Sequence, residues 1–366
     1  MKRREFLAAG SGVGAVALTG CAGGDGGPTT TTTARTTTDP YSGTLHVATY
    51  EPFIDAPSVS PGQWVKDHFE AEYPDATVEW LTPETGVNYF VQRKRAGVTI
   101  DADVYVGINP DDLVRVDEQL GTDGLFDTLA PDEIPNADAV IEDVQFDPHG
   151  RVVPYDTGYI CLVYDADEVD APGTFDALLT EEYADTLLVQ NAQNSDPGRA
   201  FLLWTVATIG EDAYLDYWQG LVDNGVTILG DWNATYTAYS NGERPMVVSY
   251  STDQVYAHRY DEPLQQHQIG FLNDQGYATP EGMGRFAASD SPGLAAAFMD
   301  FLLRPATQSQ LAVLNVMFPA TDHASPPADF TTYAQRPPET VMHSYADLQG
   351  SLDTWVEQWA QRIVQG

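Results

Sequence analysis

Aromatic side chains that could hold a flat cation gather at the ends of predicted strands and near predicted helices. These residues are Tyr50, Trp232, Tyr236, Tyr239, Tyr250 and Tyr256. A cation between aromatic rings gains roughly 0.5–2 kcal/mol per contact, depending on its desolvation. Rings combined with a few directed hydrogen bonds suit a flat, charged heteroaromatic ligand. We therefore expect a binding site for such a ligand.

Trp232 stands in a segment, 230–233, that we interpret as a turn before a helix at 234–241. A large apolar ring in a turn is expected to pack on something, and a ligand is one candidate. The other interpretation is that Trp232 caps its own helix. For Tyr239, packing in the protein core is the favoured interpretation.

A second candidate is the segment Asn194-Ser195-Asp196-Pro197-Gly198, which precedes a predicted helix. Ser195 or Asp196 could cap that helix, with Pro197 in its first turn. Capping alone is one interpretation. The other adds a ligand at the helix amino terminus, whose free N–H groups suit a hydroxyl or a phosphate.

Motifs for catalysis or metal binding are missing from the sequence. The seven histidines form no paired metal spacing, and no Gly-x-Ser-x-Gly elbow, phosphate loop or dinucleotide fingerprint occurs. The segment 109–112 resembles a fragment of a calcium loop but lacks the full spacing, so we interpret it as a helix start. We expect binding rather than catalysis, with no metal and no cofactor.

Strands and helices alternate along the body of the chain, which predicts parallel sheets covered by helices. In the first half, the predicted strands are 44–49, 77–81 and 102–107, and the predicted helices are 62–73 and 87–96. In the second half, strands are predicted at 186–189, 226–229 and 247–250, and helices at 200–209 and 212–224.

This pattern predicts an α/β fold of two lobes with a cleft between them. We expect lobe 1 at 41–153, lobe 2 at 154–285 and a return segment at 286–366. Connecting strands are predicted near 153–164 and 285–288. Strand ends and loops meet at such a cleft, which makes it the expected ligand pocket. Near the carboxyl terminus, apolar residues share one helical face that we expect to contact the core: Leu348, Leu352, Trp355, Trp359 and Ile363.

The amino terminus has the pattern of an export signal with a lipid anchor. Residues 1–21 combine the twin arginines Arg3 and Arg4, a short apolar run, and small residues directly before Cys21. Residues 22–40 are mostly Gly, Thr, Asp and Pro and are predicted to form a flexible tether. We expect lipid on Cys21 and a mature chain on the outer face of the cytoplasmic membrane.

The charge of the chain is strongly negative. Asp and Glu number 54 and Lys and Arg 17, which gives −37. The acids are scattered along the chain, which favours adaptation to concentrated salt over an acidic face for cationic ligands. No basic stripe could hold phosphates, so nucleic acid is not an expected partner. Cys161 lies in an apolar run and is predicted to be a buried small side chain. We expect a monomer.

Several short stretches, in order and spacing, resemble the thiamine-binding periplasmic proteins of ATP-binding-cassette importers. The densest are 153–159, 197–204, 230–232, 241–243, 248–252, 256–258, 315–319 and 355–359. The resemblance covers nearly all of the mature body. It implies a periplasmic-binding-protein fold of type II, in which two lobes close on thiamine.

The resemblance also implies ligand contacts for thiamine, at Tyr50, Gly86, Ser195, Trp232, Tyr250 and Tyr256. Thr85 and Asp196, next to two of these positions, complete the candidate set. Trp232 and the tyrosines would face the rings of thiamine, and Ser195 would bond a polar edge or the hydroxyethyl tail.

The chain departs from the family pattern at three places. Thr85 stands where the family has an aspartate, Val316 where it has a tryptophan, and 58–60 lacks another family tryptophan. A carboxylate at the first position could bond the aminopyrimidine and offset the thiazolium charge. Four acids could supply the missing negative charge, and the sequence does not choose among them: Glu51, Glu84, Asp156 and Asp253.

The resemblance therefore implies the binding component of an importer, which hands thiamine or its phosphates to a membrane permease driven by a cytoplasmic ATPase. Other ligands for the same clamp are polyamines or ferric iron, and iron is disfavoured because Tyr250 and Tyr256 are not adjacent. An extracellular thiamine-degrading transferase would need an activated nucleophile. A structural surface lipoprotein is the third alternative.

Overall fold

The computed structural model describes residues 39–56, 59–122 and 124–365. The predicted signal peptide, Cys21 and the tether up to residue 38 lie outside these ranges, as does Ser58. Residues from Asp39 onward form one compact unit. Within the described ranges, no helix has both the length and the apolar character needed to cross a membrane.

The first lobe is built on three parallel strands. They are β1 (Gly43–Ala48), β2 (Ala76–Leu81) and β3 (Val104–Ile108), with β1 in the middle. The helices between and after them are α1 (Glu51–Ile54), α2 (Gly62–Glu72), α3 (Asn88–Arg95) and α4 (Pro110–Leu120). The side chain of Asn109 accepts a hydrogen bond from the backbone N–H of Asp112, which confirms the predicted helix start.

The second lobe repeats this plan. Its parallel strands are β5 (Leu187–Gln190), β6 (Thr227–Leu229) and β7 (Met246–Tyr250), with β5 in the middle. Its helices are α5 (Asp196–Ile209), α6 (Tyr214–Asp223), α7 (Trp232–Ser240) and α8 (Asp253–Arg259). Both predicted parallel sheets are confirmed.

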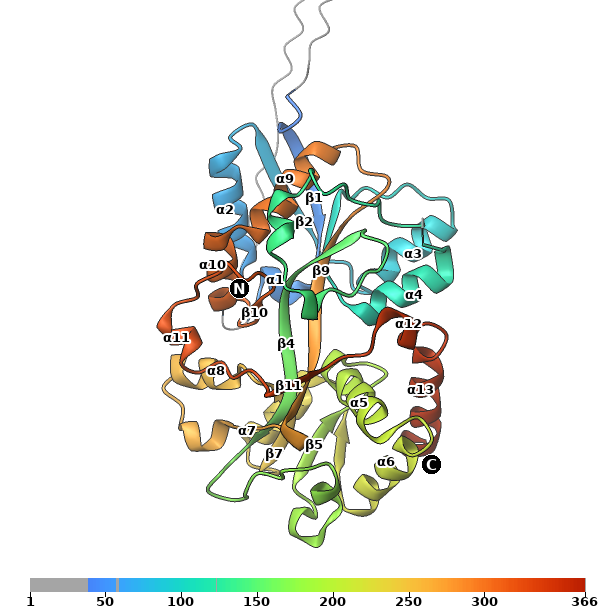
Figure 1. The fold of residues 1–366 in the computed structure, drawn as a ribbon, viewed down its shortest axis with the longest axis vertical. Helices are drawn as coiled ribbons and strands as arrows, with labels where there is room; N and C mark the ends of the chain where they lie inside the picture. The colour runs from blue at the N-terminus through green and yellow to red at the C-terminus, as the bar shows by residue number, and fades with distance from the viewer. Residues whose placement is uncertain (1–38, 57–58, 123, 366) are drawn as a thin grey trace, which may run out of the picture. The chain divides into compact units, whose positions relative to one another are not determined.

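Two long antiparallel strands, β4 (Val152–Tyr164) and β9 (Gln275–Arg285), run through both lobes (Figure 1). The last residues of β9 pair with β3, and the last residues of β4 pair with β7. One continuous sheet results, with the strand order β2-β1-β3-β9-β4-β7-β5-β6. The two lobes are thus joined by the middles of β4 and β9.

The second connecting strand was predicted at 285–288, and this prediction is wrong. Strand β9 ends at Arg285, where the prediction began. Its three glycines and Pro280 hide the strand, because glycine and proline are depleted in strands. Pro280 is tolerated because it lies between the segments of β9 that pair with β11 (Glu339–Val341) and with β3. At that point β9 pairs only with β4 and behaves as an edge strand.

The return segment supports both lobes. Its elements, with a short strand before it, are β8 (Gln268–Gly270), α9 (Pro292–Leu303), α10 (Pro305–Leu314), β10 (Phe318–Pro319), α11 (Ala328–Thr331), α12 (Tyr345–Leu348) and α13 (Leu352–Trp359). Helix α9 belongs to the core of the first lobe, whereas α13 packs against the second. The predicted apolar face contacts the core, but a turn at Gly350, with φ of +78°, divides its helix in two.

A buried ion cluster stabilises the first lobe. The guanidinium of Arg151 forms two bonds of 2.7 Å to the carboxylate of Asp117 and one of 2.9 Å to Asp147. The hydroxyl of Tyr345 also donates to Asp117, at 2.7 Å. The side chains of Arg151, Asp117 and Asp147 are at most 3% exposed, so each charge is buried but paired.

Candidate ligand-binding site at the lobe junction

Two tyrosine rings lie against glycines where the lobes meet. Tyr50 follows β1 and covers Gly107, and Tyr250 ends β7 and covers Gly158 in β4. A Cβ atom at Gly107 would stand 2.5 Å from the Tyr50 ring, and one at Gly158 would stand 2.8 Å from the Tyr250 ring. Only glycine therefore permits these contacts, and Gly107 also has φ of +95°. The structure brings both predicted tyrosines to this junction.

A hydrogen-bond network joins Tyr50 to the strands that connect the lobes. The amide nitrogen of Asn315 lies 3.0 Å from the Tyr50 hydroxyl and donates to Asp156 at 2.7 Å. The hydroxyl of Tyr155 donates to Glu281 at 2.5 Å. Residues from β4, β9 and the segment after α10 thus meet the first-lobe tyrosine. We call Tyr50, Asp156, Tyr250, Glu281 and Asn315 the junction site.

Burial and neighbouring negative charges raise the pKa values of the two carboxyl groups of this site. Burial first, and then the charge of Glu281, raises the pKa of Asp156 well above its ordinary value. Burial raises the pKa of Glu281 from 4.5 to about 7. The same two carboxyl groups, together with burial as the main cause, raise the pKa of Tyr50, which keeps its hydroxyl protonated.

Arg199 on α5 bonds across the two lobes. Its Nε donates to Asp111 of α4 at 2.6 Å, and its other nitrogen bonds Asp196. Ser195 occupies the cap position of α5 but makes no side-chain cap bond, so that predicted bond is absent. It is 6% exposed. The candidate Asp196 is engaged by Arg199, while Ser195 stays close to the helix amino terminus.

The loop after β2 contains two of the candidate residues, Thr85 and Gly86, which have different surroundings. Gly86 has φ of +54°, and a Cβ atom there would stand 3.3 Å from the hydroxyl of Tyr105 on β3. Burial and the charges of Asp112 and Glu281 raise the pKa of Tyr105. Gly86 therefore faces the acidic surroundings of the junction site. Thr85 is exposed and lines a different cavity.

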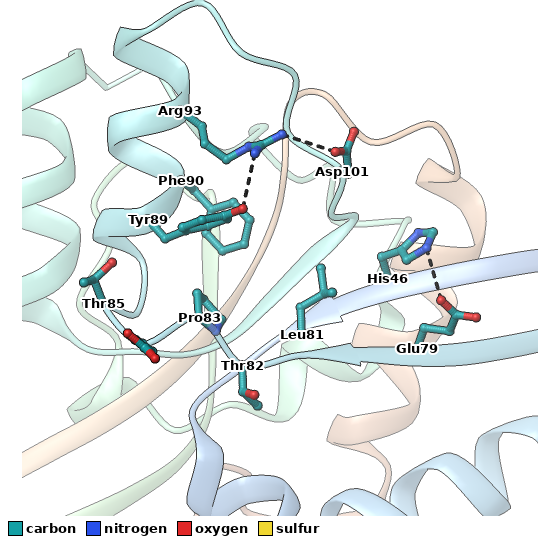
Figure 2. A pocket seen from close by; sticks show the side chains of 11 residues that line it. His46, Glu79, Leu81, Thr82, Pro83, Thr85, Tyr89, Phe90, Arg93 and Asp101 are labelled. Carbon is teal, nitrogen blue, oxygen red and sulfur yellow. Dashed lines mark hydrogen bonds and ion pairs between the residues drawn. The ribbon is translucent and has the colours of Figure 1, made fainter. Parts of the chain in front are cut away.

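That cavity, which we call the β2-edge cavity, has a volume of about 740 Å³ (Figure 2). Tyr89 and Phe90 of α3 form one side, and the loop 82–85 forms another. Two pairs of side chains line it, His46 with Glu79 at 3.5 Å, which is an ion pair when the imidazole is protonated, and Arg93 with Asp101 at 3.2 Å. The exposed Glu84 also lines it. The cavity lies within the first lobe, whereas the ligand pocket was expected between the lobes.

Trp232 is the first residue of α7, so its predicted position in a turn is wrong. Asp231 is the cap, because its side chain accepts a hydrogen bond from the N–H of Ala234. This also excludes Trp232 as the cap. The Trp232 ring is half-buried and stacks on Tyr236, with centroids 4.8 Å apart and planes at 19°.

A chain of hydrogen bonds holds the ring beneath Trp232. The hydroxyl of Tyr236 donates to Asp253 at 2.6 Å, and Asp253 bonds the Nδ1 of His267 at 2.6 Å. Burial opposes protonation of His267, but the hydrogen bond and charge of Asp253 raise its pKa. Tyr239 is buried in the core, as predicted. The stacked rings of Trp232 and Tyr236 therefore form a platform on the second lobe.

Of the four acids that could supply a missing negative charge, the structure favours Asp156. Glu51 and Glu84 are exposed, and Asp253 is engaged by Tyr236 and His267. Asp156 is 2% exposed, and its Oδ1 atom has no hydrogen-bond partner among the described residues.

Sequence reasoning missed Glu281, Asn315 and Arg199. Glu281 was overlooked because its strand was not predicted. A single acid within the otherwise uncharged segment 279–282 is the signal that could have pointed to it.

The candidate Tyr256 lies near Tyr250 and contributes to raising the pKa of Tyr250, after burial as the main cause. The guanidinium of Arg259 lies 5.6 Å from the centre of the Tyr256 ring.

Val316 marks a strained backbone beside the junction site. It has φ of +54°, a conformation that β-branched residues rarely adopt and that costs roughly 1–3 kcal/mol. Its neighbours are Asn315, which bonds Tyr50, and Met317, which lies against Gly158. The strained residue thus lies between Asn315 of the junction site and Met317, which contacts the same glycine as Tyr250. It is also one of the positions where the chain departs from the resembled family.

Residues 64–338 match the family model described as "Bacterial extracellular solute-binding protein". This match covers most of the chain. The chain belongs to this family.

Similar proteins align with this solute-binding protein over nearly its whole length. The "Thiamine-binding periplasmic protein" of Escherichia coli (strain K12) is 27% identical over 324 residues, which is 87% of this chain and 93% of that one. The protein of the same description from Brucella suis biovar 1 is 27% identical over 86% and 91% of the two chains. A solved structure titled "Periplasmic thiamin binding protein" aligns with a TM-score of 0.74 and 25% identity, over 88% of this chain and 96% of that one. The solute-binding protein therefore has the two-lobe fold of type II.

Proposed function

We propose that this solute-binding protein captures thiamine, or its phosphates, outside the cytoplasmic membrane and delivers it to the permease of an importer driven by a cytoplasmic ATPase. The observation that carries the proposal is the junction site, which combines aromatic rings with buried carboxyl groups in a chain whose similar proteins are described as thiamine-binding. The thiazolium ring is flat and cationic, so rings and acids suit it.

The proposed contacts with thiamine are those of the candidate set, Tyr50, Gly86, Ser195, Trp232, Tyr250 and Tyr256, with Thr85 and Asp196 beside them. Tyr50 and Tyr250 are supported most directly, because both rings lie at the junction between the lobes. Trp232 is supported as the half-buried outer ring of its stack with Tyr236, whose hydroxyl is held by Asp253.

The proposed mechanism is closure of one lobe on the other, with no bond made or broken in the ligand. Contacts present only in the closed form shift the population toward it. The bond from Arg199 to Asp111 joins helices of different lobes, and we propose that it stabilises the closed form. We also propose that lipid on Cys21 holds the protein at the outer membrane face.

Calorimetric titration of the purified protein with thiamine in concentrated salt tests this function. Saturable one-to-one binding at micromolar concentration or tighter is the expected result. A folded protein that gives neither heat nor thermal stabilisation with thiamine, but does with a polyamine, would show that the clamp takes another ligand. Analysis of thiamine after long incubation separates binding from degradation, which would yield cleavage products.

Trp232→Ala tests the ring platform. We expect it to weaken thiamine binding by ~1–3 kcal/mol, because a stacked ring in a desolvated site is lost. Trp64→Ala is the matched control: Trp64 is also half-buried and stacked, on His68 at 4.0 Å, but it lies on α2 in the first lobe. Equal affinity in the two variants would count against a ligand contact for Trp232.

A further inference from the structure

The two acids of the junction site are direct partners across the strands that connect the lobes. Asp156 of β4 pairs with Glu281 of β9, next to a bulge that leaves Tyr155 as an extra residue in β4. Side chains of directly opposed residues are about 4.5–5.5 Å apart at Cβ, and like charges there repel each other. Bulges are frequent beside binding sites, where they redirect a side chain.

The hydrogen bonds of this pair come only from neutral groups. Asn315 donates to Oδ2 of Asp156, and Tyr155 donates to Glu281. Oδ1 of Asp156 is buried without a partner. In the described part of the chain, the ion pairs of buried arginine and histidine side chains go to other acids.

The groups that face the pair from other elements give it no positive charge. They are the hydroxyls of Tyr50 and Tyr250 and the carboxyl groups of Asp112 on α4 and Asp196 on α5. The guanidinium of Arg199 lies near Asp112 and lowers the pKa of that acid. Arg199 is bound by Asp111 and Asp196. The acids raise the pKa of Glu281 further, after burial as the main cause. The pKa of each acid is raised, so the pair holds a proton at a pH where isolated carboxyl groups have lost theirs.

We propose that the Asp156–Glu281 pair is the receptor for the positive charge of the ligand and releases its shared proton to solvent when the cation binds. This inference rests on the proposed function, since it assigns the thiazolium ring to the pair. The cation replaces the proton as the partner of the second carboxylate, with Oδ1 of Asp156 as the open acceptor. The ligand class is a flat monocation. A neutral ring of the same shape would not gain the attraction between its charge and the second carboxylate.

The experiment is titration calorimetry of the full protein with thiamine from about pH 6 to 8, in pairs of buffers that differ in ionisation enthalpy. We expect up to about one proton to be released per thiamine at the acidic end. The affinity should rise with pH by up to about tenfold per pH unit for as long as the pair keeps its proton without ligand, and then level off.

Asp156→Asn and Glu281→Gln should each weaken thiamine binding at least about tenfold and abolish the proton release. Both should fold, because each removes a buried carboxyl group that repels its neighbour; circular dichroism checks this. Wild-type protein should prefer thiamine to an analogue whose thiazolium is replaced by an uncharged ring, and the two variants should lose that preference. Glu51→Gln and Glu84→Gln, which change exposed acids, are the matched controls and should retain wild-type behaviour.

Thiamine binding without proton release, and with unchanged affinity in both junction variants, would overturn this inference and leave the proposed function standing. The absence of thiamine binding by folded wild-type protein would overturn both. Proton release that persists in both variants would assign the linkage to other acids and would also overturn the inference.

Discussion

Two groups of buried carboxyl groups in this protein have opposite surroundings. In the Arg151 cluster, Asp117 and Asp147 share one guanidinium, and burial is outweighed by hydrogen bonds that lower the pKa of Asp147. At the junction site, Asp156 and Glu281 have no cation, and burial raises the pKa of both. The first arrangement is complete within the protein. The second lacks the positive charge that a ligand could bring.

The difference separates stability from binding. A buried charge that is paired inside the chain holds the fold together, whereas one that is left unpaired costs folding free energy. Such a cost persists where function requires it, as backbone strain does at functional sites. The comparison therefore predicts opposite effects of removing charge at the two places.

The largest effect is expected in the Arg151 cluster. Arg151→Met leaves two buried carboxylates without their cation and should lower the free energy of unfolding by about 3–5 kcal/mol. Urea unfolding in constant salt measures this. Arg362→Met is the matched control, because Arg362 forms an exposed pair with Asp216 and should change stability by less than about 1 kcal/mol. Equal losses in the two variants would remove the basis of the comparison.

At the junction site the sign should reverse. Glu281→Gln should raise the free energy of unfolding by about 1–3 kcal/mol near pH 8, because wild-type protein must ionise a buried acid there. The raised pKa of Glu281 means that its folded form holds a proton that the unfolded form has lost between about pH 4.5 and 7. The contribution of Glu281 to stability is therefore present below pH 4.5 and is lost as the pH rises through about 7.

Urea unfolding of wild type and Glu281→Gln across that range checks the reversal. The difference between the two proteins should grow with pH and then become constant. The acids far from Glu281 affect both proteins alike, so the difference reports on Glu281 together with Asp156, whose pKa the charge of Glu281 raises. A difference that does not vary with pH would show that Glu281 is not protonated in the folded protein.

The sequence predicts the position of a junction residue only where that residue lies beside a clearly patterned strand. Tyr50 and Tyr250 could be placed at the junction because clear strand patterns end beside them, and strand ends of parallel sheets meet there. Glu281 could not, because Gly282, Gly284 and Pro280 conceal its strand. The local pattern of β4 was clear, yet only its pairing with β9 shows that Asp156 faces another acid.

Contacts between distant segments were also beyond the sequence. Arg199 and Asp111 are 88 residues apart and belong to different lobes, so neither helix alone predicts their bond. Trp232 was placed in a turn because the cap signal of Asp231 was not recognised one residue earlier. Trp232 was noticed as an aromatic residue near a helix start, whereas Arg199 was not noticed at all.

A smaller effect is expected from Arg199, which is paired like Arg151 but across the lobes. Arg199→Gln removes a contact of the closed form and should weaken thiamine binding by about 1 kcal/mol, through a lower population of that form. Small-angle scattering should show a larger radius of gyration without ligand. Arg244→Gln, which changes a pair with Asp185 that is not between lobes, is the control. An unchanged radius and affinity would show that the bond does not hold the lobes together.

The smallest effect is expected at the β2-edge cavity, although it is large and has both charges and rings. Arg93 pairs with Asp101, whose side chain is 74% exposed, so water replaces either partner readily. Arg93→Gln should change thiamine affinity and unfolding free energy by less than about 0.5 kcal/mol each. Calorimetric titration of Arg93→Gln and Glu281→Gln with thiamine compares the two losses of affinity directly. If Arg93→Gln instead weakened binding as strongly as the junction variant, the ligand would have to be assigned to a cavity with paired charges, and an unpaired buried acid would no longer distinguish the binding site in this fold.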